Sequence, residues 1–215
     1  MTIENAIPLL GILLLLFLIG LLAQKRVYCT YPVFFTYQVW CLSSTILGMI
    51  ASALPPEEFL RFYVVSLVVD ALFQFGVLAE LGRTVARHNH QGSPRWTLVA
   101  LLLLPTALLL HSLFRWSTPP GISAFGLFYV RLQQALPILL VAFLLALIWW
   151  SRLQGLQWPD LPLQIASGLG SYFLVSLLVA VVHTHQEIGD QYHWADVAQS
   201  GSYLAVLGYW LLKLA

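Results

Sequence analysis

The sequence predicts an all-α, polytopic transmembrane bundle of about seven spans. The chain is 60% hydrophobic and only 9% charged, whereas a soluble globular domain carries about 25% charged residues. Apolar runs near or above the ~18 residues that a spanning helix needs recur along the whole chain. These runs are continuously apolar and do not alternate at period two as barrel strands do, so helices rather than strands are predicted to satisfy the backbone in lipid.

Seven predicted spans follow one another with short polar connections. They cover residues 5–23, 32–54, 59–81, 96–114, 125–150, 161–182 and 194–212. The third is expected to continue as a helix to residue 88, and Gly92 and Pro94 predict a turn over residues 89–95. Pro137 falls inside the fifth span and predicts a kink. We find no linker, low-complexity tract or clear repeat, so residues 1–215 are predicted to form a single transmembrane domain.

The basic residues predict the orientation of the bundle through the positive-inside rule. In a seven-span topology most of the basic residues fall on one side: Lys25, Arg26, Arg83, Arg87, Arg95, Arg152 and Lys213. The opposite side receives Arg61 and Arg115, together with several acids. The N-terminus is therefore expected outside and the C-terminus in the cytoplasm, as in a multi-pass protein of the bacterial inner membrane. With a net charge of +1, the chain carries no electrostatic footprint for nucleic acid.

An acid in the third span predicts an intramembrane site, because ionisable groups at bilayer depth are costly. Asp70 lies near the middle of that span, and Tyr63, Ser66 and Gln74 share its 3–4 residue spacing, so we expect one face that looks into the bundle. Asp70 is either a proton-titrating or ligand-binding group, or a structural acid that is ion-paired or neutral and hydrogen-bonded.

The other polar residues of the interior supply candidate partners for Asp70. Arg131 on the fifth span is the expected counter-charge, with Gln134 one turn deeper. Asp196, near the start of the seventh span, competes for the same arginine and begins a helical stripe with Gln199. The candidate intramembrane site thus comprises Asp70, Gln74, Arg131, Gln134, Asp196 and Gln199.

Three further residues have structural interpretations. Glu80, at the inner end of the third span, is expected to pair with Arg83 or Arg87. Cys29 and Cys41 would lie ~18 Å apart along a helix, beyond the reach of a disulfide. Both are therefore predicted to be free thiols, with Cys41 a small core residue.

A histidine-rich segment, residues 183–196, is predicted to form the outer loop between the sixth and seventh spans. It holds three of the six histidines and three carboxylates, and imidazole with carboxylate suits zinc, iron or copper. The candidate ligands are His183, His185, Glu187, Asp190 and His193, with His111 from the end of the fourth span as an additional one. The cofactor would be a divalent metal, or a haem held by His111 and His183. The alternative is a solvated polar loop.

Two stretches carry a resemblance to known proteins. The run Tyr31-Pro32-Val33-Phe34-Phe35-Thr36-Tyr37, and Arg61-Phe62-Tyr63 with Asp70 and Glu80, resemble a pattern in hypothetical bacterial membrane proteins, chiefly from acidobacterial genomes. Those proteins have a similar length and number of predicted spans and no assigned activity. The resemblance therefore implies a bacterial origin and brings no function with it.

The seven predicted spans also invite comparison with membrane zinc hydrolases of the alkaline ceramidase and adiponectin-receptor type. This chain departs from them, because its last span lacks an HxxxH pair and its histidines crowd the outer loop. A shared span number is analogy only, since one architecture hosts unrelated functions.

Three functions stay open from the sequence, and it does not decide whether the chain is an enzyme. The first is a sensor, receptor-like or accessory subunit that acts through a membrane partner or as a homo-oligomer, which fits the absence of a catalytic motif. The second is a periplasm-facing metal-dependent enzyme or metal or haem carrier that uses the histidine-rich segment. The third is a small proton-coupled transporter that uses Asp70 and Arg131. The lack of an internal repeat in the sequence counts against this hypothesis, because many transporters are built from repeats.

Overall fold

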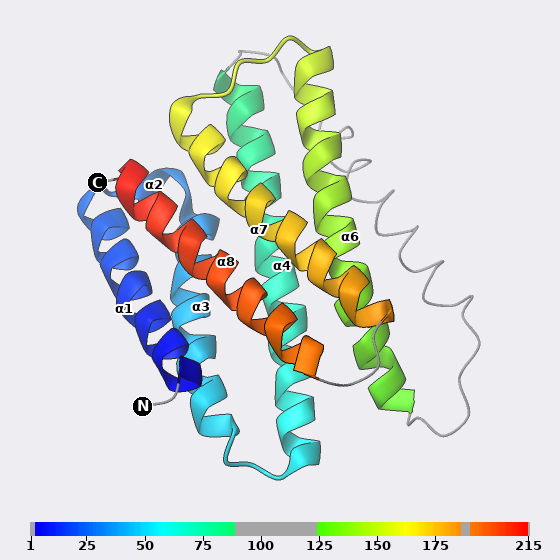
Figure 1. Ribbon diagram of the computed structural model, residues 1–215. Helices are drawn as coiled ribbons and strands as arrows, with labels where there is room; N and C mark the ends of the chain where they lie inside the picture. Colours follow the sequence, from blue (N-terminus) through cyan, green and yellow to red (C-terminus); the bar gives the residue numbers. More distant parts are fainter. Residues whose placement is uncertain (1–2, 89–123, 186–189, 215) are drawn as a thin grey trace. The chain divides into compact units, whose positions relative to one another are not determined.

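The computed structural model describes residues 3–88, 124–185 and 190–214, and each element in these ranges is a helix (Figure 1). In chain order they are α1 (Ile3–Gln24), α2 (Val27–Thr30), α3 (Pro32–Ala51), α4 (Pro56–His88), α6 (Ala124–Leu153), α7 (Asp160–His185) and α8 (Asp190–Leu214). Five of these helices, α1, α3, α4, α6 and α7, are long and apolar enough to cross a membrane. The predicted all-α class is therefore confirmed for the described residues.

The third predicted span does continue to residue 88. Helix α4 is unbroken over 33 residues, about 50 Å at the α-helical rise, so it exceeds the ~30 Å hydrocarbon core of a bilayer. Pro137 lies inside α6 as predicted. The short helix α2 was not predicted; the chain enters it through Arg26, which has a left-handed backbone conformation with φ 54°. The predicted turn over 89–95 and the predicted span over 96–114 lie outside the described residues.

The chain divides into two compact units. The first comprises Met1–Glu80 with Val197–Ala215, and the second comprises Leu81–Asp196. In the first unit, α1 packs along α3, the two helices running antiparallel after the reversal at α2 (Figure 1). The final part of α8 joins the same unit, because Phe34 on α3 meets Trp210 edge-on at a centroid separation of 5.2 Å.

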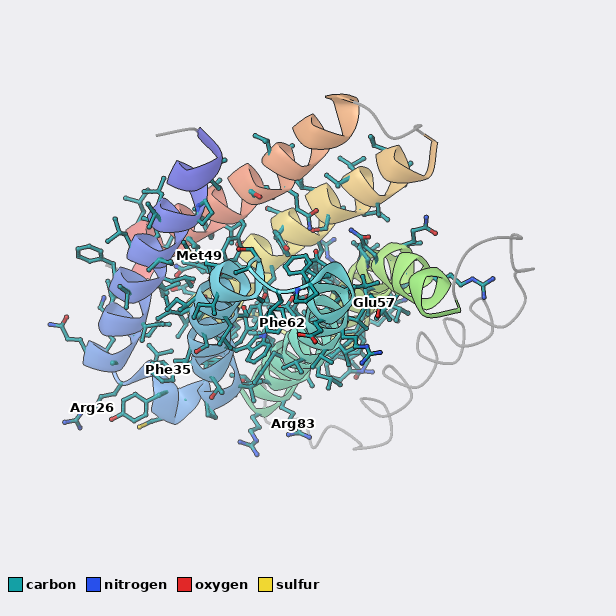
Figure 2. The ribbon with its side chains drawn as sticks, turned by 90° about the horizontal axis from the view of Figure 1, so that it is seen from below. Arg26, Phe35, Met49, Glu57, Phe62 and Arg83 are labelled. Carbon is teal, nitrogen blue, oxygen red and sulfur yellow. The ribbon has the colours of Figure 1, made fainter. Side chains whose placement is uncertain are left out.

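The core of the first unit is aliphatic and aromatic, and its outward side chains are apolar as well. Side chains that are 0% exposed include Leu15, Leu18, Leu22, Phe34, Val77, Leu78 and Leu207. Phe17 is 71% exposed and Ile50 66% exposed, as expected for helices whose solvent is lipid. Figure 2 shows the charged Arg26 pointing away from the helices at the turn after α1.

Helix α3 receives its N-terminal cap from another helix. Its local sequence supplies none, since Tyr31 at the cap position makes no side-chain bond and Pro32 follows. Glu80 of α4 fills this role: its Oε1 accepts from Val33 N and its Oε2 from Phe34 N, both at 3.0 Å. A carboxylate at a helix N-terminus satisfies free N–H groups and complements the helix dipole. The carboxylate of Glu80 thus bonds to the backbone of α3, a partner that the sequence analysis did not name, and the expected pair with Arg83 or Arg87 stays a prediction.

Gly76 allows the close approach of α4 and α3 beside this cap. A Cβ added at Gly76 would lie 2.9 Å from Val33 Cγ1, whereas a Cβ at Gly48 would meet nothing within 4 Å. We therefore expect Gly76→Ala to lower the free energy of unfolding by about 1 kcal/mol, because overpacking costs about 1–3 kcal/mol and the gain in helix propensity offsets part of it.

Gly48→Ala is the matched control for this prediction, and it should leave stability unchanged or slightly raised. Unfolding of the purified protein by detergent titration measures both variants. Equal stability of the two would contradict the close packing of α3 against Gly76.

In the second unit, α6 and α7 form an antiparallel pair joined by a defined turn. Gly155, with φ 62°, ends α6 in the left-handed conformation that glycine adopts without strain. Gly155 N donates to Arg152 O at 3.0 Å and Leu156 N donates to Ser151 O at 2.9 Å, the two bonds of a Schellman motif. Trp158 Nε1 then donates to Ser151 Oγ at 2.8 Å, so the turn is fixed by side chains as well as by backbone.

Candidate functional site

A hydrogen-bond chain joins α3 and α4 in the first unit, and it is buried at Gln74 and Tyr37 and half-buried at Asp70. Gln74 Nε2 donates to Asp70 Oδ2 at 2.6 Å and to Tyr37 Oη at 3.0 Å. Gln74 is 3% exposed and Tyr37 is also 3% exposed. The predicted site residues Asp70 and Gln74 are therefore brought together, and they gain a partner from α3 that the sequence analysis did not name.

The helix register explains why these three side chains meet. Asp70 and Gln74 are four residues apart and so lie on one face of α4. Helix α3 runs antiparallel to α4, with Val33 level with Gly76. One turn further along, Tyr37 lies level with Phe73, at a ring-centroid distance of 6.4 Å. Trp40 stacks on the same Phe73 ring at 6.0 Å, so aromatic rings flank the hydrogen-bond chain.

Two more polar side chains extend this chain toward α8. The Cys41 thiol, on the next turn of α3, lies close to the hydroxyls of Tyr37 and Tyr203 and within the electrostatic influence of Asp70. Cys41 is buried and unbridged, which confirms its prediction as a free core thiol. We call the resulting set the polar cluster: Tyr37, Cys41, Asp70, Gln74 and Tyr203.

Asp70 is the acid of the polar cluster, which contains no Lys, Arg or His. The basic residues of the first unit, Lys25, Arg26, Arg61 and Lys213, are all exposed. Within that unit, the described side chains thus give the Asp70 carboxyl an amide as its partner rather than a cation. Such a group can hold a proton, or bind a guest that donates a hydrogen bond.

The remaining predicted residues of the intramembrane site fall in different places. Gln199 lies half-buried on α8 in the first unit, whereas Arg131 and Gln134 lie half-buried on α6 in the second. The ion pair between Asp70 and Arg131 therefore stays a prediction. Asp196 is in α8, and its side chain is outside the described part of the structure.

The predicted inward face of α4 is correct at its centre and wrong near its start. Tyr63 is 41% exposed although it shares the helical phase of Asp70 and Gln74. The antiparallel register of α3 and α4 places Tyr63 level with Ile46 and Leu47, which are themselves 43% and 45% exposed. Tyr63 packs instead on Phe59 of its own helix, at a centroid distance of 6.3 Å.

The histidine-rich segment is more helical than predicted. Helix α7 continues through His183 to His185, and α8 begins at Asp190 and includes His193. The physical reason is local: Gly189 followed by Asp190 is typical of a helix start, because an acid in the first turn complements the dipole. Of the predicted outer loop, residues 186–189 lie outside the described residues.

The predicted metal ligands lie where the structure does not describe side chains. His111 and Glu187 are outside the described residues, as are the side chains of His183, His185, Asp190 and His193. Among the side chains that are described, no group of three or more His, Cys, Asp or Glu lies together. The metal site therefore stays a prediction.

Tyr37 and Cys41 are the members of the cluster that the sequence analysis missed as site residues. A signal for them exists in the sequence, since Tyr37, Gln38 and Cys41 lie at helical spacing within an otherwise apolar span. Tyr203 continues the helical spacing of Asp196 and Gln199 along α8. The structure assigns it to the polar cluster through its proximity to Cys41.

The fold and the site together define a class. In the part that the structure describes, the chain is a helical protein with several helices suited to crossing a membrane, and one compact unit contains a polar cluster with an acid. No protein-family model, curated protein or solved structure matches the chain.

Proposed function

We propose that the chain is a seven-span protein of a bacterial inner membrane that acts as a sensor, receptor-like or accessory subunit through a membrane partner. The five helices suited to spanning, α8 and the predicted span over residues 96–114 would make up the seven. The uneven distribution of Lys and Arg supports a topology with the N-terminus outside and the C-terminus in the cytoplasm.

The observation that carries this proposal is the buried bond from Asp70 through Gln74 to Tyr37. An acid at bilayer depth marks function by default. Here it is hydrogen-bonded to an amide that also holds a second helix, so a change at Asp70 alters the contact between α3 and α4. A sensor or receptor-like subunit needs a site at which binding or protonation changes the packing of its helices, and Asp70 with Gln74 provides one.

Isolation in native lipid tests the proposal. The tagged full chain is captured in polymer-bounded native membrane discs as wild type, Asp70→Asn and Glu57→Gln. Glu57 is an exposed acid in the first turn of the same helix and serves as the matched control. We expect a membrane partner to be recovered at constant stoichiometry with wild type and with Glu57→Gln. With Asp70→Asn the amount of recovered partner should fall at least about fivefold, because coupling between two sites typically changes an affinity by about fivefold or more.

Two results would count against a responsive subunit. One is recovery of the chain alone from native membranes. The other is equal retention of the partner by Asp70→Asn, provided that this variant is inserted and folded to the wild-type level.

A second candidate function is a metal-dependent enzyme or metal carrier at the periplasmic face. The observation that favours it is the placement of the histidine-rich segment on two consecutive helix ends, joined by residues 186–189. Asp190 and His193 are three residues apart in α8, a spacing that puts both on one helix face. The residues 183–185 at the end of α7 are close along the chain.

Elemental analysis and an absorbance spectrum test this second candidate. On protein purified without chelator or metal-affinity resin, we expect about one metal per chain, lost in His183→Ala and in His193→Ala. His88→Ala, at the end of α4, is the control and should retain the metal. A colourless, metal-free wild-type protein would remove this candidate and leave the first untouched.

A further inference from the structure

The contact between α3 and α8 in the first unit contains a fully buried amide. Gln38 is 0% exposed, and neither its Nε2 nor its Oε1 has a hydrogen-bond partner among the described residues. Each unsatisfied buried group costs about 1–3 kcal/mol, and the large majority of buried polar atoms in native proteins are paired. We therefore expect the Gln38 amide to form hydrogen bonds with a group that its apolar neighbours do not supply.

The position of Gln38 on α3 follows from the two contacts that flank it. Phe34, Gln38 and Cys41 share one face of α3, at i, i+4 and i+7. Phe34 meets Trp210 of α8, and Cys41 lies close to Tyr203 of the same helix. Gln38 thus lies between these contacts, along the line where α3 faces α8.

The part of α8 that lies level with Gln38 is apolar. The buried α8 residues between Tyr203 and Trp210 are Val206 and Leu207, which are 6% and 0% exposed. Neither side chain can donate or accept a hydrogen bond. Two polar side chains flank this apolar stretch: Cys41, one turn away on α3, and Tyr203 on α8.

The chemistry of the amide restricts what it can bind. Nε2 donates and Oε1 accepts, so a guest that satisfies both must itself accept and donate. A simple cation cannot accept from Nε2, and an anion without a proton cannot donate to Oε1. Val206, Leu207 and Cys41 beside it are buried, which favours a small guest. Water meets these conditions, and it typically makes about three hydrogen bonds when buried.

We propose that the line of contact between α3 and α8 is an internal hydration site, in which the Gln38 amide binds water. The Tyr203 hydroxyl or the Cys41 thiol supplies the third hydrogen bond. Both residues belong to the polar cluster. The bound water therefore connects to the same group of polar side chains as Asp70.

Magnetic resonance in lipid nanodiscs tests the site directly, with water itself as the probe. In protein labelled with ¹⁵N at glutamine side chains, magnetisation is transferred from water to the amide protons, and the Gln38 signal is identified by its loss in Gln38→Leu. We expect transfer to Gln38, and we expect it to weaken in Tyr203→Phe. Gln24, which is exposed at the end of α1, is the positive control. Transfer to Gln24 with none to Gln38 overturns the proposal.

Stability gives an independent readout. If water satisfies the amide, Gln38→Leu removes its binding site and should lower the unfolding midpoint by about 2–5 °C. If the amide is dry, the same change removes two unsatisfied groups and should raise the midpoint. Gln24→Leu, the exposed control, should leave it unchanged. A raised midpoint for Gln38→Leu overturns the hydration site.

Discussion

Replacing Glu80 by alanine is expected to destabilise the protein by about 3 kcal/mol. The change removes both acceptors of Val33 N and Phe34 N and leaves two N–H groups of the first turn of α3 without a partner. Hydrogen bonds to a charged group contribute about 1.5–3 kcal/mol each, and Pro32 and Tyr31 offer no replacement cap. Tryptophan fluorescence during unfolding by detergent titration measures the loss.

Two variants separate the cap from a general effect of charge. Glu80→Gln keeps one acceptor oxygen and should recover about half of the loss. Glu58→Ala removes an exposed acid from the first turn of the same helix and should change stability by less than about 0.5 kcal/mol. If Glu80→Ala were as stable as Glu58→Ala, the carboxylate would not act as the cap of α3.

Replacing Gln74 by leucine is the second large effect, and we expect a loss of about 2–4 kcal/mol. Leucine has a similar volume but no donor, so the Asp70 carboxyl loses its 2.6 Å bond and the Tyr37 hydroxyl its 3.0 Å bond. The Tyr37 hydroxyl then remains buried and the Asp70 carboxyl half-buried, and each lacks a hydrogen bond to offset its desolvation. Thermal unfolding in a fixed lipid composition measures this loss.

A double-mutant cycle shows whether the three residues act as one network. Tyr37→Phe alone should cost about 1 kcal/mol. When it is combined with Gln74→Leu the two losses should not add, because the first variant removes a group that the second already leaves unpaired. Strict additivity of the two free-energy changes would show that Tyr37 and Gln74 do not interact.

The helices were predictable because their signal is local. Continuous apolar runs define α1, α3, α4, α6 and α7. The ends of these helices in the structure differ from the predicted bounds by only a few residues. The site was predictable in part for the same reason, since Asp70 and Gln74 lie four residues apart on one helix and the spacing alone places them on one face.

What the sequence did not reveal depends on the register between helices. Tyr37 reaches Gln74 only because α3 runs antiparallel to α4 with Val33 level with Gly76. Glu80 caps α3 because the same register brings its carboxylate to the first turn of α3. Neither fact has a local signature, and periodicity along one helix carries no information about which residue of another helix lies opposite.

The Schellman turn at Gly155 has a consequence for the order in which the chain assembles during synthesis. It closes α6 against α7 with contacts between residues that are near in sequence, so this helical hairpin can enter the bilayer and pack as soon as α7 emerges from the ribosome. The first unit has no such independence. Its contact between Phe34 and Trp210 waits for the last helix to be made, and until then the face of α3 that carries Gln38 and Cys41 lacks its cover from α8. We therefore expect the polar cluster to be completed only after α8 has been synthesised, later than the pair of α6 and α7.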